Sequence, residues 1–153
     1  MARVIAIDGP SGAGKSSVSR IVGKKLGFLH VDSGALYRIM TWQALVRKVD
    51  TDNPDAVAAF APTVEIECRP ENGAIAYYVG GEPPGERIRT PEINAHASQV
   101  ATVKAVRDKI TALLCVDDVV GRRHVARKGD TILHFAVDGG RKIRGEDDQA
   151  DLN

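Results

Sequence analysis

The sequence predicts an α/β domain with a parallel sheet, because it runs twice from a short apolar stretch through a polar turn into a helix. In the first unit, Val4 to Ile7 is a candidate buried strand, and apolar residues return at helical spacing after a glycine-rich turn: Val18, Ile21, Val22 and Leu26. Gly27 is expected to end this helix.

In the second unit, Phe28 to Val31 is the strand, and Ser33 is expected to cap the next helix. The buried stripe of that helix is predicted to be Leu36, Ile39, Met40 and Ala44.

The glycine-rich turn carries the pattern of a phosphate-binding loop, or P-loop. This pattern is G-x-x-x-x-G-K-[ST], formed by Gly9, Gly14, Lys15 and Ser16. Glycines let several backbone N–H groups converge on one phosphate, and the following helix N-terminus adds partial positive charge. We expect Lys15 to reach the terminal phosphates of a nucleoside triphosphate and the Ser16 hydroxyl to hold Mg²⁺. The expected ATP-binding residues are therefore Gly9, Pro10, Ser11, Gly12, Ala13, Gly14, Lys15, Ser16 and Ser17. The alternative is a chance match on an ordinary glycine turn, and the strand before and helix after it argue against that.

Asp32 follows the second strand, and in parallel sheets ligands bind at the carboxyl ends of the strands. Tyr37 and Arg38 come one turn later on the predicted helix. Each of the three also has an ordinary structural interpretation: Asp32 as a competing helix cap, Tyr37 as a half-buried core residue and Arg38 as a solvated charge.

A chain of 153 residues fits one domain, and its 43% hydrophobic and 27% charged residues are typical of a soluble globular protein. The net charge of +1 argues against a broad nucleic-acid or membrane surface. No apolar run approaches the ~20 residues of a transmembrane helix and no signal peptide is visible, so we expect a cytoplasmic protein. Cys68 and Cys115 have no metal-ligand spacing and are expected to be reduced packing residues.

The middle of the chain predicts a short helix, a small β insertion and two further helices. Asn53 and Pro54 are expected to open the short helix, which runs through Ala61. Two strand candidates follow, TVEIEC from residue 63 and GAIAYYV from residue 73, and they are expected to be antiparallel. Thr90 and Pro91 then begin a helix that carries Ser98. The last helix spans Val103 to Leu114 with Arg107 beside its expected buried stripe of Val103, Val106, Ile110 and Leu113.

Four separated stretches together resemble the bacterial cytidylate kinases, a family of P-loop nucleoside monophosphate kinases: IDGPSGAGKSS, LGFLHVDSGALYR, RIRTPEINAHASQVA and KAVRDKI. The resemblance implies a single kinase domain over residues 1–153, with residues 62–90 as an inserted subdomain that closes over the monophosphate. It implies transfer of the ATP γ-phosphate to CMP or dCMP by a monomer that binds neither nucleic acid nor membrane. It also implies a monophosphate site formed by Asp32, Ser33, Tyr37, Arg38, Arg89, Ser98 and Arg107.

Physical chemistry agrees with those roles. Phosphoryl transfer requires two anions to be aligned and their charge to be spread, and the planar donor fork of arginine suits the acceptor phosphate. Arg38 is the expected acceptor contact, and Lys15 and Arg38 are the expected catalytic pair. Ser98 and Arg107 resemble the residues with which the family reads cytosine.

The resemblance ends after about Leu114, so residues 115–153 are interpreted as a divergent or degraded tail and the fold as incomplete at its C-terminus. The strand before the P-loop would then lack sheet partners, unless the apolar run from Ile132 to Val137 pairs with it. The stretch from Thr131 to Val137, followed by Asp138, could form a strand with a Walker-B-like carboxylate or an ordinary edge strand. A basic run could imitate the cations of a kinase lid or be a solvated surface: Arg122, Arg123, Arg127 and Lys128.

Two alternatives to a working kinase therefore stay open. The chain could be an inactive or truncated nucleotide-binding remnant of such an enzyme. A GTPase switch is less well supported, because the sequence shows no N-K-x-D motif and no suitably placed D-x-x-G motif.

Overall fold

The computed structural model describes residues 4–7, 9–10, 12–114 and 131–135. In these residues the elements follow in the order β1 (Val4–Ile7), α1 (Lys15–Leu26), β2 (Phe28–His30), α2 (Ser33–Val46), α3 (Pro54–Phe60), the 3₁₀ helix η1 (Ala61–Thr63), β3 (Glu67–Glu71), β4 (Ala74–Tyr78), the 3₁₀ helix η2 (Gly85–Ile88), α4 (Pro91–Thr102), α5 (Lys104–Leu114) and β5 (Thr131–Phe135).

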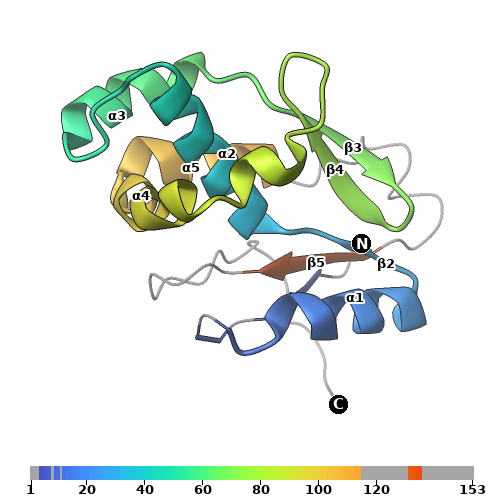
Figure 1. Ribbon diagram of the computed structural model, residues 1–153. Coiled ribbons are helices and arrows are strands. Elements are labelled where there is room, and N and C mark those ends of the chain that lie inside the picture. Colours follow the sequence, from blue (N-terminus) through green and yellow to red (C-terminus); the bar gives the residue numbers. More distant parts are fainter. Residues whose placement is uncertain (1–3, 8, 11, 115–130, 136–153) are drawn as a thin grey trace.

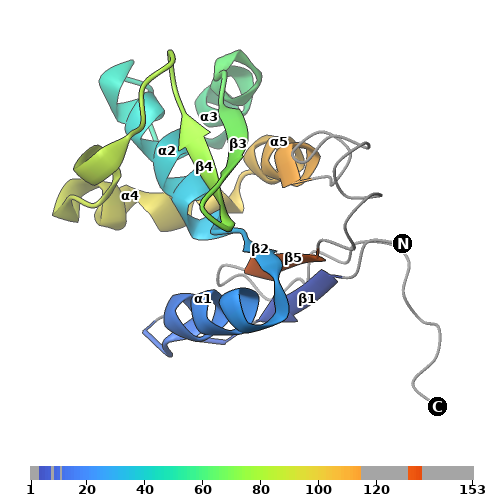
Figure 2. The same ribbon diagram turned by 90° about the vertical axis from the view of Figure 1, so that its right-hand side faces the viewer.

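The strands form one sheet in the order β1-β5-β2-β4-β3. The pairings of β1 with β5, β5 with β2 and β2 with β4 are parallel, and β4 pairs antiparallel with β3. Figures 1 and 2 show α1 on one side of β2 and β5 and the layer of α2, α3, α4 and α5 on the other. The predicted α/β class with a parallel sheet and an antiparallel insertion is confirmed.

β5 gives the strand before the P-loop a sheet partner. Val4 pairs with Ile132 on one side of β5, and Leu29 pairs with the same Ile132 on the other. The apolar run that was expected as the nearest substitute therefore forms β5, which lies between β1 and β2 in the sheet. Val137 and Asp138 lie outside the described residues, so the Walker-B hypothesis is not tested.

The main core lies on the α2 side of the sheet. All four residues of the predicted stripe on α2 are fully buried: Leu36, Ile39, Met40 and Ala44. They pack with apolar side chains of α3, α4, α5 and the β3–β4 hairpin. On α5 the predicted stripe is also confirmed, with Val106 and Ile110 fully buried and Leu113 partly buried.

Helix α1 packs differently. Its only fully buried residues are Ser19 and Gly23, one turn apart, whose small size lets the helix lie close to its neighbours. Val18, Ile21 and Leu26 are 50%, 57% and 55% exposed. The helical spacing of these apolar residues predicted the helix correctly but did not mark its packed face. Gly27 ends α1 as predicted, in a left-handed conformation with φ 72°.

The turn of the hairpin sets the register of its strands. Asn72 and Gly73 both have positive φ, 50° and 77°, as a two-residue type I′ turn requires. Because Glu71 must then pair with Ala74, the first strand is Glu67–Glu71, and the prediction of a strand over residues 63–68 is wrong. Val64 and Ile66 are buried, as the alternation suggested, but in coil before the strand.

Three helix starts were predicted, and two are confirmed. Asn53 caps α3 by accepting from the N–H groups of residues 55 and 56, and Thr90 caps α4 by accepting from that of residue 93. Ser33 is not the cap of α2. The Asp32 carboxylate accepts from the Ala35 N–H at 3.1 Å, because Asp32 is the last non-helical residue and Ser33 already begins the helix.

Cys68 is a free thiol, half-buried beside the core, and burial raises its pKa to about 11. It is therefore an inert packing residue, as predicted, and Cys115 lies outside the described residues. Within the described ranges, no helix is long and apolar enough to cross a membrane.

The two isoleucines Ile39 and Ile21 test where the core lies. We expect Ile39→Ala, at a fully buried position of α2, to lower the free energy of unfolding by about 2–5 kcal/mol. The same change at exposed Ile21 should alter it by less than about 0.5 kcal/mol. Urea unfolding followed by circular dichroism measures both, and equal losses would contradict this packing.

Candidate functional site

A cleft of about 410 Å³ lies between α1 and the start of α2, and residues of α4 and of the segment before it also line the cleft. Polar side chains from these elements line it: Ser16, Ser17, Arg20, Asp32, Arg38, Arg89 and Asn94. The cleft therefore joins the P-loop helix to four residues of later elements, three of which were predicted to bind a monophosphate: Asp32, Arg38 and Arg89.

The P-loop has the conformation its glycines predict. Gly12 and Gly14 both have φ 79°, and no atom lies within 4 Å of where a side chain on either would begin. Lys15 folds over the loop, and its Nζ donates to the carbonyl oxygens of Gly9 and, at 2.7 Å, Pro10. Gly14 is the residue before α1, so the first N–H groups of the helix face the loop. Of the predicted ATP-binding residues, Ser11 lies outside the described residues.

Asp32 holds the opposite wall together. Its carboxylate caps α2 and also lies 3.5 Å from Nη2 of Arg38, one and a half turns further along that helix. Its carbonyl oxygen accepts from the Tyr77 hydroxyl at 3.1 Å, which ties the hairpin to the end of β2. Burial raises the pKa of Tyr77 well above its usual range, so the hydroxyl keeps its proton for this bond.

Arg89 is the residue directly after η2, and it lines the cleft. Ile88 is buried and anchors this segment, and the guanidinium carbon of Arg87 lies 5.5 Å from the centre of the Trp42 ring on α2. Arg89 itself is exposed, and among the described residues its guanidinium has one ion-pair contact, at 4.0 Å from Glu86.

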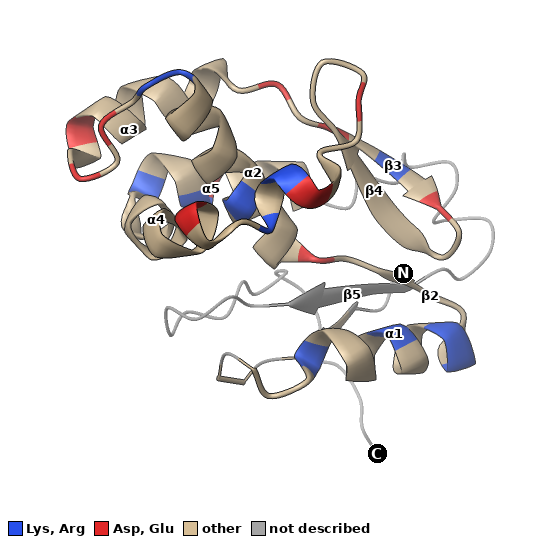
Figure 3. Cartoon of the chain, in the orientation of Figure 1, with Lys and Arg blue, Asp and Glu red and all other residues tan. Residues whose placement is uncertain are grey.

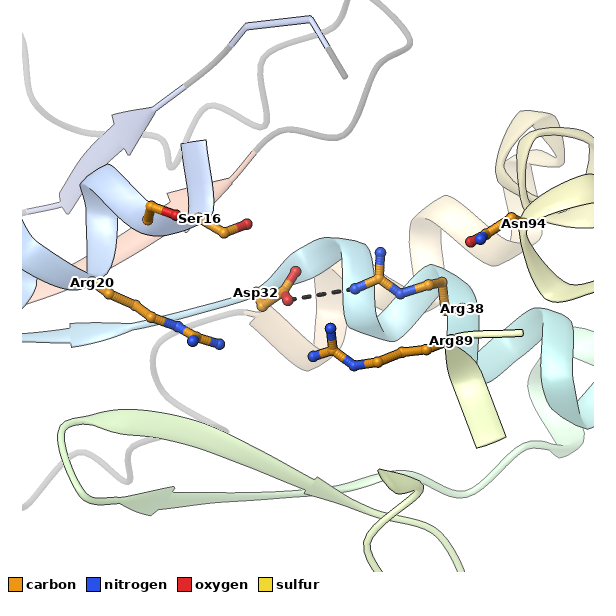
Figure 4. Close-up of a pocket in the computed structure, with 7 residues that line it drawn as sticks. Ser16, Arg20, Asp32, Arg38, Arg89 and Asn94 are labelled. Atoms are coloured by element: carbon orange, nitrogen blue, oxygen red, sulfur yellow. Dashed lines mark ion pairs between the residues drawn. The ribbon is translucent and has the colours of Figure 1, made fainter. Parts of the chain in front are cut away.

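Three guanidinium groups and one carboxylate thus meet at the cleft. Figure 4 shows Arg38 and Arg89 on one side of Asp32 and Arg20 on the other, beside Ser16. Figure 3 shows basic positions on α1 and on the helical layer across from it. The excess of positive charge suits a ligand with phosphate groups.

Four predicted monophosphate residues do not line this cleft. Ser33 and Tyr37 are buried within α2, whereas Ser98 on α4 and Arg107 on α5 are exposed. Burial raises the pKa of Tyr37, and the nearby charge of Arg107 acts in the opposite direction. Arg107, on α5, therefore lies near Tyr37 of α2 but does not line the cleft.

Sequence reasoning missed Arg20 and Asn94. A helical signal existed for Arg20, because it lies four residues after Ser16 on the same helix, whereas no spacing in the sequence indicated Asn94. His30 is a third neighbour of the site that was not predicted. It is buried at the end of β2, and its pKa is lowered by burial and by Arg20, with Asp32 opposing. The imidazole is thus mainly uncharged at neutral pH.

The donor atoms fit Mg²⁺ only as a partner of bound phosphate. The described residues contain no cluster of three His, Cys, Asp or Glu side chains that could hold a metal alone. The exposed Ser16 hydroxyl at the cleft is an oxygen donor, and Mg²⁺ commonly keeps water and phosphate oxygens beside one or two protein ligands.

Comparison of the sequence with known proteins identifies relatives of this chain. The sequence pattern of the family described as cytidylate kinase matches residues 5–127, more than half of the chain. The chain belongs to the cytidylate kinase family. It is 36% identical over 130 residues to the cytidylate kinase of Geobacter sulfurreducens, covering 85% of this chain and 52% of that protein. It is also 36% identical over 129 residues to the cytidylate kinase of Bacillus thuringiensis, covering 84% of this chain and 54% of that one.

The extent of the match corrects one sequence-based boundary. The cytidylate kinase pattern continues past Leu114, where the resemblance was expected to end, as far as residue 127. The chain nevertheless spans about half the length of the curated cytidylate kinases it matches.

The double role of Asp32 in this wall can be tested by stability. Asp32→Ala should lower the free energy of unfolding by about 1 kcal/mol, because α2 loses its cap. Asp32→Asn should retain most of that stability, since an asparagine oxygen caps equally well while the ion pair with Arg38 is lost. Urea unfolding distinguishes them, and equal losses in the two variants would show that the ion pair, not the cap, stabilises this wall.

Proposed function

We propose that this protein transfers the γ-phosphoryl group of ATP to the phosphate of CMP or dCMP, giving ADP and CDP or dCDP. The observation that carries the proposal is the cleft in which the P-loop helix faces Arg38 and Arg89, in a member of the cytidylate kinase family. This arrangement lets a donor phosphate chain and an acceptor phosphate meet between oppositely placed cations.

The donor side consists of the P-loop and the first turn of α1. Backbone N–H groups of the loop and helix terminus hold the ATP phosphates, and Lys15 exchanges its carbonyl partners for phosphate oxygens. The Ser16 hydroxyl would hold Mg²⁺ together with these phosphates. Bound Mg²⁺ would neutralise part of the charge that develops during transfer.

The acceptor side consists of Asp32, Arg38 and Arg89. Arg38 is fixed by its ion pair with Asp32, so its planar donor fork is oriented before the substrate arrives. Arg89 follows the hairpin and η2, and it supports residues 62–90 as an inserted subdomain that covers the monophosphate. The cytosine would lie toward α4 and α5, where Ser98 and Arg107 are exposed.

We also propose that the protein acts as a monomer in the cytoplasm on free nucleotides. It is not expected to bind nucleic acid or membranes, because a net charge of +1 argues against a broad basic surface.

An assay of ADP release with ATP, Mg²⁺ and CMP tests the reaction. CMP-dependent turnover is expected, and Lys15→Ala should reduce it by about 10²–10³-fold because one donor to the migrating charge is lost. The circular dichroism spectrum of Lys15→Ala should match the parent, since the side chain only contacts loop carbonyls. ATP binding without CMP-dependent turnover would favour a nucleotide-binding remnant instead.

Arg38 and Arg107, both predicted to bind the monophosphate, should have separable effects. Arg38→Ala should weaken any nucleoside monophosphate, whereas Arg107→Ala should weaken CMP more than UMP, because an unpaired polar base edge costs about 1–3 kcal/mol. Isothermal titration with CMP and UMP measures the ratio. An unchanged ratio in Arg107→Ala would reject its base-reading role.

A further inference from the structure

Arg20 is a cation of the cleft that no sequence motif singles out. It lies on α1, one turn beyond Ser16, and both line the cleft. In Figure 4 its side chain extends from α1 toward the side where Asp32, Arg38 and Arg89 meet. The cleft is therefore bounded by arginines on both sides rather than on the acceptor side alone.

The three arginines are not equally engaged. Arg38 is paired with Asp32 at 3.5 Å, and Arg89 has its 4.0 Å contact with Glu86. Arg20 is exposed, and in the described part of the chain it forms no ion pair or hydrogen bond. Its positive charge helps to lower the pKa of His30 at the end of β2, which agrees with a guanidinium near the base of the cleft.

Position along α1 separates Arg20 from the donor phosphates. A rise of 1.5 Å per residue places Arg20 about 6 Å beyond Ser16 along the helix axis, away from the loop and Lys15. At that distance it faces the wall formed by Asp32 and Arg89, where the acceptor phosphate is expected. Its planar guanidinium group can donate to two phosphate oxygens at once.

We propose that Arg20 binds the phosphate of the acceptor nucleotide from the P-loop side of the cleft, opposite Arg38 and Arg89. This inference rests on the proposed function for the identity of the acceptor. It assigns α1 a second task, because the helix that presents its N-terminus to ATP would also hold the acceptor phosphate in line with it.

The test compares Arg20→Gln with Lys25→Gln, which removes the same charge from an exposed position of the same helix outside the cleft. Isothermal titration of each variant uses CMP, cytidine and ATP. Arg20→Gln should weaken CMP by roughly 10-fold or more, as expected for a charged hydrogen bond, and leave ATP and cytidine unchanged. Arg20→Lys should recover part of the CMP affinity, and Lys25→Gln should bind all three ligands like the parent.

In steady-state kinetics, Arg20→Gln should raise KM for CMP while KM for ATP stays constant. CMP affinity equal to the parent's would overturn the inference and leave the proposed kinase reaction standing. Equal weakening of ATP and CMP would place Arg20 on the donor side and also overturn it. A parent that binds CMP through Arg20 without turnover would overturn the reaction but not the contact, and a parent that binds no CMP would overturn both.

Discussion

The contacts of Asp32 join the sheet, the core helix and the cleft. One residue at the carboxyl end of β2 caps α2 through its side chain, pairs with Arg38 on the same helix and accepts the Tyr77 hydroxyl through its carbonyl. The start of α2, the orientation of Arg38 and the attachment of the hairpin are therefore set together. A parallel sheet allows one residue to have all these contacts, because the carboxyl ends of its strands lie at one edge, where a helix begins and a ligand can bind.

The two walls of the cleft differ in how they are supported. The Arg38 wall stands on α2, whose buried side chains form the centre of the core, and η2 is tied to it through Ile88 and the Arg87–Trp42 contact. The P-loop wall stands on α1, which buries only Ser19 and Gly23 fully and contacts β2 and β5. The Arg38 wall is thus fixed by a large apolar core, and the P-loop wall by close approach of α1 to the sheet.

Sequence predicted those parts of the fold that depend on local pattern. The stripe of α2, the caps Asn53 and Thr90 and the P-loop glycines follow from spacing and residue type alone. The first hairpin strand was misplaced because alternation fits several registers, and only the Asn72–Gly73 turn selects one. In the site, Asp32, Arg38 and Arg89 were predicted to share a ligand and do line one cleft. Arg20 was missed because its role depends on which face of α1 lines the cleft, and the apolar residues of α1 pointed to a different face.

The clustering of like charges is itself informative. Three guanidinium groups around one carboxylate repel one another in the free protein, and the pairing of Arg38 with Asp32 offsets only part of that repulsion. Such an arrangement lowers stability unless an anion binds, so folding alone gives no reason for it. A phosphate group carries close to two negative charges at neutral pH and can accept from all three donors. Because a ligand that binds only the folded state stabilises it, a phosphate held by these three arginines would stabilise the α1 and α2 walls by relieving this repulsion.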